Sequence, residues 1–165
     1  MVDDKKGEEF DDVRSPVFSP NDKSIAYWAL QDGYISVVHG DKRGREFALI
    51  GDAISGSQIE PVFSPNSKQI AYRVKHYGRL FLVKADSKYE VFEIFDSAGK
   101  PTFSPDSKLL AYWIRKGDKE FLMLGDQKGE DFDFVTDPIF SLDGKKIAYG
   151  ARKGRELWWK VVKIK

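Results

Sequence analysis

Few residues in this sequence are of the types that carry out chemistry. The chain of 165 residues contains two histidines, His39 and His76, and no cysteine. Without cysteine there is no thiol nucleophile, no disulfide bond and no cysteine-based zinc site. The histidines fall in different segments of the chain, and we interpret both as surface loop residues. The sequence has no nucleophile elbow, phosphate-binding glycine loop or His-Glu-x-x-His zinc motif.

The acidic pairs do not predict a catalytic centre either. Glu8 and Glu9 are consecutive, as are Asp11 and Asp12, and consecutive side chains of a strand point to opposite faces. Such pairs cannot act together as a general acid and base. The segments 41–44 and 126–129 lack the alternating oxygen ligands of a calcium loop and are predicted to be turns. We therefore predict no catalytic residue, no metal site and no cofactor.

Composition restricts the class of partner and the fold class. The formal net charge of +1 creates no overall field that would attract nucleic acid or an anionic membrane, so neither is predicted as a partner. Aromatic residues make up 14% of the chain and accompany many Val and Ile residues, a bias that favours β-strands. The lack of cysteine and the hydrophilic N-terminus predict a cytoplasmic protein, or a periplasmic one if a signal peptide has been removed.

The chain contains four copies of one pattern, Pro-x-Phe-Ser-Pro-Asn/Asp-x-Lys-x-Ile/Leu-Ala-Tyr. The copies begin at residues 16, 61, 101 and 138, so they lie 45, 40 and 37 residues apart. A period near 40 residues with several short strands per unit is typical of a β-propeller blade. Pro suits the first residue of a strand, and Ser-Pro-Asn/Asp is turn chemistry. In the fourth copy Leu142 replaces the second Pro, and Gly144 serves the same turn.

Each repeat is predicted to form a four-stranded antiparallel blade. The third strand of each blade is expected at residues 34–38, 79–83, 120–124 and 156–160. A fourth, outer strand is expected in the first three copies, within residues 41–47, 86–92 and 126–132. The Phe of each copy is expected to fill the space between neighbouring blades. The predicted fold class is therefore all-β, with residues 1–165 forming a single propeller domain of four blades per chain.

The fourth copy ends directly after its third strand, and the N-terminus resembles the outer strand that it lacks. Residues 4–10 match 41–47 and 126–132 almost position by position. We therefore predict that residues 4–13 supply the outer strand of the last blade. The predicted ring-closing residues are Glu8, Glu9 and Phe10 in the first segment and Trp158, Lys160 and Val162 in the last.

Two modes of closure fit this pairing. The N-terminal segment can close its own ring, giving a four-bladed propeller, or it can complete the last blade of a second copy, giving an eight-bladed homodimer. Segments 1–12 and 145–165 carry opposite charges, which supports the pairing in both cases. Eight blades lie within the usual range of propeller sizes, and exchange of an identical element is a common route to dimers. The sequence favours the dimer and leaves both modes open.

The repeated pattern resembles the WD40-like repeat of bacterial and archaeal β-propellers, of the PD40 or TolB type. The resemblance extends to a subgroup whose blades carry Gly-x-Glu-Tyr/Phe-Asp, which is similar to residues 7–11 and 129–133 here. It covers essentially the whole chain and implies a propeller fold that binds a protein or another ligand on a loop face. The shared residues are scaffold residues, so the resemblance assigns no activity.

The loops between the second and third strands are predicted to emerge on one face of the ring. Three of these four loops are basic, with aromatic side chains nearby for stacking. The predicted ligand-binding residues are Lys75, His76, Tyr77, Arg79, Trp113, Lys116, Arg152 and Arg155. We therefore predict a non-catalytic scaffold for a protein, peptide or glycan ligand, preferably an acidic peptide or glycan. The alternatives are solvated hairpin tips without a ligand, a structural unit that oligomerises by strand exchange, and an enzyme acting on carbohydrate in a central funnel.

Overall fold

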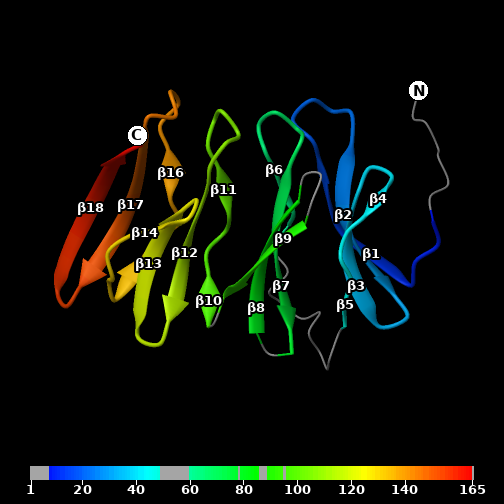
Figure 1. Ribbon diagram of the computed structural model, residues 1–165, viewed down its shortest axis with the longest axis horizontal. Helices are drawn as coiled ribbons and strands as arrows, with labels where there is room; N and C mark the ends of the chain where they lie inside the picture. The colour runs from blue at the N-terminus through cyan, green and yellow to red at the C-terminus, as the bar shows by residue number, and fades with distance from the viewer. Residues whose placement is uncertain (1–7, 49–59, 78, 86–88, 95, 165) are drawn as a thin grey trace.

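The structure, a computed structural model, describes residues 8–48, 60–77, 79–85, 89–94 and 96–164. Within these residues the chain forms four antiparallel β-sheets. The sheets follow one another along the longest axis of the molecule in sequence order (Figure 1). The prediction of an all-β protein built from antiparallel sheets is confirmed. None of the described segments is a helix with the length and hydropathy needed to cross a membrane.

The four sheets correspond to the four sequence repeats. The first contains β1 (Asp12–Phe18), β2 (Ile25–Gln31), β3 (Tyr34–His39), β4 (Lys42–Arg43) and β5 (Phe47–Ala48). The second contains β6 (Val62–Phe63), β7 (Ile70–His76), β8 (Arg79–Ala85) and β9 (Tyr89–Ile94). The third contains β10 (Ser97–Ala98), β11 (Thr102–Phe103), β12 (Leu110–Lys116), β13 (Lys119–Leu124) and β14 (Gln127–Lys128). The fourth contains β15 (Phe134–Val135), β16 (Ile139–Phe140), β17 (Lys146–Lys153) and β18 (Glu156–Lys163).

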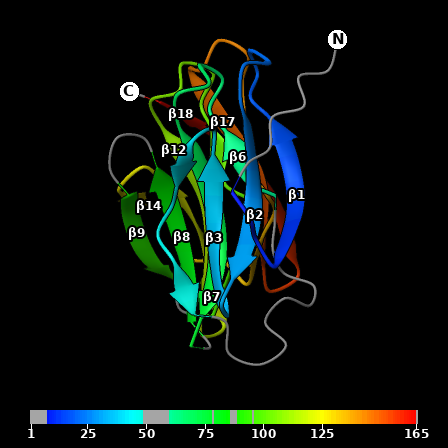
Figure 2. The same ribbon diagram turned by 90° about the vertical axis from the view of Figure 1, so that its right-hand side faces the viewer.

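Strands pair in the order in which they follow in the sequence, from an inner strand to an outer one. Figure 2 looks along the row of sheets and shows the inner strand β1 on one side and the outer strands β9 and β14 on the other. The inner strand is divided in the third and fourth sheets, where β10 and β11 both pair with β12, and β15 and β16 both pair with β17. Among the described residues, β18 pairs with β17 alone.

Both faces of the middle sheets are apolar, because each packs against a neighbouring sheet. In the second sheet, Ile70 and Tyr72 pack against the first sheet, whereas the intervening Ala71 packs against the third. Alternate side chains of a strand point to opposite faces, so these strands read as nearly continuous apolar runs. The residues Ile147 and Tyr149 of β17 likewise pack against the third sheet.

The repeated Ser-Pro-Asn/Asp turns form as predicted, with one correction. In the first copy the Ser19 hydroxyl donates to the Asn21 carboxamide oxygen at 2.8 Å, and that oxygen accepts the backbone N–H of Lys23 at 3.2 Å. The left-handed conformation falls on the residue after Asn or Asp, rather than on Asn or Asp itself. These residues have φ between 55° and 69° and are Asp22, Ser67, Ser107 and Gly144. Glycine adopts this conformation without steric cost, so Gly144 avoids the backbone strain that its three counterparts tolerate.

The described part of the N-terminal segment lies against the first sheet, at the opposite end of the row from β18 (Figure 1). The Phe10 ring meets Tyr27 edge-on at a centroid distance of 6.3 Å, and the Arg43 guanidinium lies 5.4 Å from the Phe10 centroid. The Asp11 N–H donates to the Leu30 carbonyl at 2.9 Å. Among the described residues this segment therefore does not pair with β18 of its own chain, so closure within one chain, one of the two predicted modes, is not observed. Residues 4–7 of the predicted strand lie outside the described residues, and exchange with a second copy stays a prediction.

The ring-closing residues predicted on β18 lie on the side of the strand that is turned toward the third sheet, where Trp158 and Val162 stay partly exposed. Trp158, Lys160 and Val162 are directly paired with residues of β17 that pack against the third sheet, and directly paired side chains share one face of a sheet. The Lys160 ammonium also donates to Glu130 at 3.0 Å. The outward-facing residues of β18 are Leu157, Trp159 and Val161, whose exposed fractions are 81%, 87% and 64%.

Candidate binding face

The hairpins that join the second and third strands of each sheet all turn at one edge of the molecule, the lower edge in Figure 1. They are the β2–β3, β7–β8, β12–β13 and β17–β18 hairpins. The Ser-Pro turns lie at the opposite, upper edge. We call the lower edge the hairpin face. Antiparallel pairing places the hairpins there, because successive strands of each sheet reverse direction.

An aspartate anchors three of the four hairpin tips. The carboxylates of Asp11, Asp96 and Asp133 accept a backbone N–H from residue 32, 117 and 154 at 2.8, 2.7 and 2.6 Å. In every case the acceptor precedes the donor by 21 residues. Sequence analysis missed this function, although a signal was present: each aspartate stands five residues before the Pro that begins its repeat.

The second hairpin carries an aromatic cluster. The His76 ring lies 4.3 Å from the Tyr77 ring and 5.7 Å from the Phe47 ring of the first sheet, both edge-on. Its Nδ1 lies 3.2 Å from the Ala48 carbonyl. Tyr77 has φ of 50° and is 68% exposed. His76 is thus half-buried between two sheets, and Tyr77 is the exposed aromatic side chain of this tip.

The predicted cations are exposed and lie at or beside the hairpin tips. Lys75 and Arg79 flank the second tip, and Lys116 precedes the third. Arg155 lies at the fourth tip. Arg152 lies three residues before Arg155 and donates to the Gly154 carbonyl at 3.2 Å. The structure therefore brings these five predicted residues to one edge of the molecule.

Lys119, at the third tip, is paired with an aspartate anchor. Its ammonium donates to Asp133 at 2.7 Å. This bond, followed by the N–H of Gly154, holds the pKa of Asp133 below its usual range, and the same bond raises the pKa of Lys119. The anchors place carboxylates among the exposed cations, so the hairpin face carries both signs of charge.

Trp113 is the exception among the predicted ligand-binding residues, because it lies between sheets and does not reach the hairpin tip. Its indole N–H donates to the Asp137 carboxylate at 2.8 Å. The same oxygen accepts the Lys100 backbone N–H at 3.2 Å. The indole lies directly against Gly99, where a Cβ atom would collide with both Trp113 and Asp137. Trp113 is thus partly buried between sheets, and its use for stacking on a ligand stays a prediction.

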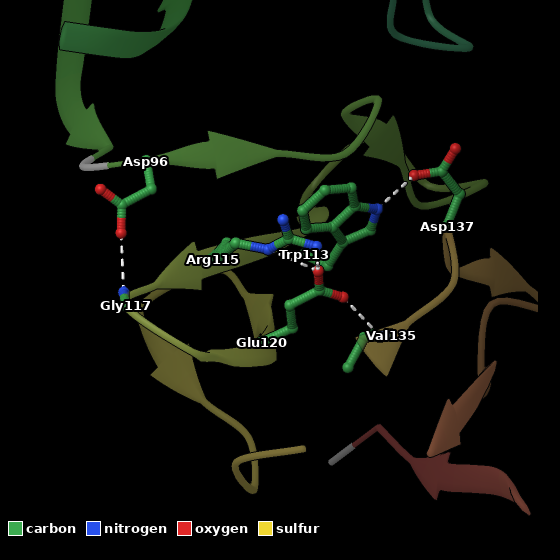
Figure 3. A network of polar contacts seen from close by, with 7 residues as sticks. All are labelled: Asp96, Trp113, Arg115, Gly117, Glu120, Val135 and Asp137. Atoms are coloured by element: carbon green, nitrogen blue, oxygen red, sulfur yellow. Dashed lines mark hydrogen bonds and ion pairs between the residues drawn. The ribbon is translucent and has the colours of Figure 1, made fainter. Parts of the chain in front are cut away.

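A buried carboxylate joins the third sheet to the fourth (Figure 3). Glu120 of β13 is 1% exposed, and one of its oxygens accepts two N–H bonds from the Arg115 guanidinium of β12. The other oxygen accepts the Val135 backbone N–H of β15 at 2.6 Å. The ion pair and the backbone bond together satisfy the buried charge. This arrangement fixes the start of the fourth sheet relative to the third hairpin and has a structural role.

The described residues contain no group of three or more His, Asp or Glu side chains placed to hold a metal ion. The arrangement at the hairpin face consists of rigid tips, exposed cations and one exposed aromatic ring. Such a surface can bind a ligand through charge-assisted hydrogen bonds and ring contacts.

Comparison with known proteins yields matches among solved structures. No family model matches the sequence, and no curated protein is similar to it. TolB from Acinetobacter baumannii is 20% identical and has a TM-score of 0.50, over 93% of this chain and 41% of TolB. The β-propeller domain of the Trilobed protease from Pyrococcus furiosus has an open velcro topology. It is 17% identical and has a TM-score of 0.55, over 93% of this chain and 54% of that one. An oligogalacturonate lyase in complex with manganese is 12% identical with a TM-score of 0.56, over 90% of this chain and 50% of that one.

These matches define the fold class: the chain has a β-propeller fold. The resemblance stated from the repeated sequence pattern is thereby confirmed. The chain spans about half the length, or less, of these proteins. At such identities the matches show the fold alone, and the set includes a protease domain and a lyase, so they assign neither an activity nor its absence.

Proposed function

We propose that the chain is a non-catalytic binding scaffold whose hairpin face takes up an acidic peptide or glycan. The observation that carries the proposal is the position of Lys75, Arg79, Lys116, Arg152 and Arg155 along one edge of the fold. Four sheets, read as four propeller blades, hold these tips at fixed spacing, and the aspartate anchors limit the mobility of three of them. Rigid, convergent loops on a propeller scaffold are a common form of binding surface.

The chemistry of the tips favours an anionic ligand with some apolar or ring-like surface. Exposed guanidinium groups bind carboxylates in a two-point geometry, and Tyr77 provides a ring for stacking. The paired Lys119 contributes less, because Asp133 already neutralises it. An acidic peptide or an acidic glycan meets both requirements.

The test uses a fluorescein-labelled oligoglutamate peptide and a labelled oligogalacturonate as probes in fluorescence anisotropy. The variant neutralises four cations of the hairpin face, Lys75→Gln, Arg79→Gln, Arg152→Gln and Arg155→Gln. The matched control neutralises four exposed lysines of the upper edge, Lys23→Gln, Lys68→Gln, Lys108→Gln and Lys145→Gln. We expect the first variant to weaken binding about fourfold or more, since each of the four exposed charges contributes about 0.2–1 kcal/mol.

The control separates a specific surface from the general effect of charge, because both variants lose four positive charges. Equal weakening in the two variants, or undiminished binding in the first, would contradict the proposal. The bound probe also identifies the ligand class, since a peptide and a glycan of similar charge differ in their contact with Tyr77.

A second candidate function is a structural assembly unit that joins copies by strand exchange. The observation that favours it is β18, which has one strand neighbour among the described residues and a largely exposed apolar face. An exposed apolar edge strand is a template for pairing with another chain.

A further inference from the structure

We propose that two copies of this chain associate head to tail, with the first sheet of each copy packed against the fourth sheet of the other. This proposal rests on the second candidate function and specifies its contacts, and it is independent of ligand binding at the hairpin face. Each chain would contribute four blades to one eight-bladed ring that contains two identical junctions. A twofold axis closes such a ring without leaving a free end.

Exposed large apolar side chains gather at the two ends of the row of sheets. We call the outer surface of the first sheet the N-terminal end face; its exposed apolar residues are Val13, Phe18, Ile25 and Tyr34. We call the outer surface of the fourth sheet the C-terminal end face; its exposed apolar residues are Phe134, Ile139, Leu157, Trp159 and Val161. The strand register places each set on the side away from the neighbouring sheet. Contiguous exposed apolar surface of this kind indicates an interaction site.

The N-terminal end face corresponds to the surfaces that face a preceding sheet inside the molecule, and the C-terminal end face corresponds to the surfaces that face a following sheet. At each internal junction, the Tyr of one repeat packs toward the preceding sheet: Tyr72 toward the first, Tyr112 toward the second and Tyr149 toward the third. Tyr27 occupies the same repeat position on the N-terminal end face. In turn, Ala71 and Ala111 face the following sheet, and Ala148 occupies that position on the C-terminal end face. The N-terminal end face therefore lacks a preceding sheet and the C-terminal end face lacks a following sheet. Each end face is the kind of surface that the other one would contact.

Phe10 already lies where the preceding sheet would place its outer strand. Phe132, which leaves the outer strand of the third sheet, packs edge-on against Tyr149 of the fourth sheet at 6.5 Å. Phe10 packs against the equivalent Tyr27 in the same edge-on manner at 6.3 Å. Phe132 also exchanges two backbone hydrogen bonds of 2.8 Å with Glu120 of β13. By repeat position the counterpart of Glu120 is Leu157 of β18, so we expect Phe10 to pair with Leu157 of the second copy.

The Ser-Pro turns carry a further contact, which is present at the first two internal junctions. The Ser67 hydroxyl accepts the Asn21 backbone N–H of the preceding sheet at 3.2 Å. The Ser107 hydroxyl accepts the Asn66 backbone N–H in the same way at 3.0 Å. At the new junction the corresponding acceptor is the Asp22 carboxylate, which can take the Asp143 N–H of the other copy. Each recurring contact thus has an available pair of groups at the proposed junction.

The occupant of each end face is a second copy and not the other end of the same chain. In the structure the two end faces lie at opposite ends of the longest axis (Figure 1), and Phe10 remains on the first sheet. The chain spans 54% of the propeller domain of the Trilobed protease. Two copies therefore supply about as much chain as one such domain.

The test exploits the absence of cysteine in the natural sequence. If Phe10 pairs with Leu157, the antiparallel register places Glu9 opposite Trp158 in a non-hydrogen-bonded pair, where Cβ atoms come close enough for a disulfide. The variant with both Glu9→Cys and Trp158→Cys is expected, after mild oxidation, to run on a denaturing, non-reducing gel at twice the chain mass of 18.8 kDa. Each single variant alone is expected to form no specific disulfide, whereas an equal mixture of the two is expected to form the covalent dimer.

Light scattering on the unmodified chain supplies the second measurement. We expect twice the mass of the chain, and a shift to the monomer mass for Trp159→Glu, which places a charge in the centre of the C-terminal end face. The matched control, Tyr77→Asn, removes an exposed aromatic ring at the hairpin face and is expected to stay dimeric.

Three results would overturn the proposal: an unmodified chain of monomer mass, a Cys pair that closes within one chain, or Trp159→Glu that remains dimeric. Loss of probe binding with an intact dimer would instead contradict the hairpin face alone, so failures of the two proposals are distinguishable. Far-UV circular dichroism on each variant confirms that the sheets are retained.

Discussion

The carboxylate of Asp133 lies 2.6 Å from the backbone N–H of Gly154, although 21 residues separate them. Asp133 follows the outer strand of the third sheet, and Gly154 forms the hairpin tip of the fourth with φ of 60°. The bond ties the segment that connects two sheets to the tip of the second one. The same bond occurs at Asp11 and Asp96, so one aspartate for each of three repeats orients the hairpin face.

We expect Asp133→Ala to lower the midpoint of urea unfolding and to increase amide hydrogen exchange at the fourth hairpin, because the Gly154 N–H loses its acceptor. Asp133→Asn should have a smaller effect, since its side-chain oxygen still accepts a hydrogen bond. Asp118→Ala is the matched control, as its side chain is 89% exposed and its contact with Lys119 is long at 3.9 Å. An equal loss in Asp133→Ala and Asp118→Ala would contradict the anchoring role.

The network around Glu120 gives a prediction with a larger magnitude. Glu120→Ala leaves the buried N–H of Val135 without an acceptor, whereas Arg115, which is 47% exposed, can be solvated; we expect it to destabilise the fold by about 1–3 kcal/mol. Glu120→Gln keeps an acceptor for Val135 and should cost less. The measurement is the free energy of unfolding in urea.

The partner residue provides the control for this network. Arg115→Met keeps most of the aliphatic stem but leaves Glu120 buried without its cation, so we expect a loss of stability. A double variant Glu120→Leu with Arg115→Met should recover part of the loss, because it removes both charges. Additive losses in the double variant would show that the two residues act separately.

A close approach at Gly99 gives a third prediction. A Cβ atom at this position would collide with the Trp113 indole and with the Asp137 carboxylate. We expect Gly99→Ala to destabilise the fold by about 1–3 kcal/mol through overpacking. Combining it with Trp113→Leu should cost less than the sum of the single changes, as measured by a double-mutant cycle in urea. Exact additivity would contradict the steric explanation.

The sequence predicted the fold because the fold is determined by local repetition. Pro and Phe recur in every copy and the Ser-Pro-Asn/Asp turn in the first three, and each has a physical role that is visible in a single sequence. The third strands were placed to within a few residues, from Tyr34–His39 to Glu156–Lys163. The blade topology also predicted that the hairpins between second and third strands would lie on one face.

The parts that sequence analysis missed depend on relations between sheets. The match between residues 4–10 and the outer strands showed which strand the segment resembles, but not which copy of the chain it pairs with. Whether Trp158 or Trp159 faces outward depends on the register of β18, and a shift of one residue exchanges the two faces. Trp113 was predicted to be available for stacking. Its contact with Asp137 joins residues 24 positions apart, so the sequence pattern did not indicate it. Such contacts leave no periodic signal in one sequence.

His39 gives a prediction for the pH dependence of stability. Its ring meets Phe63 of the second sheet edge-on at 5.0 Å, and its Nε2 lies 3.5 Å from the Ser24 hydroxyl. Burial, followed by the charge of Lys42, lowers the pKa of His39 below its ordinary value of 6.5. The folded state therefore favours the neutral ring, and the unfolded chain binds a proton more readily. This contribution to stability is complete above the unfolded pKa of 6.5 and is lost progressively as the pH falls from there toward the lower folded pKa.

We expect the free energy of unfolding to decrease between pH 7 and pH 5, a range in which most carboxylates stay ionised. His39→Gln should flatten this decrease, because Gln does not titrate. Lys42→Gln should reduce it, since a smaller positive charge near the ring lets the folded state bind the proton more easily. His76→Gln serves as the matched control for the loss of one histidine. The measurement is urea unfolding at half-unit steps of pH, and a profile that keeps its full slope in His39→Gln would assign the dependence to other groups.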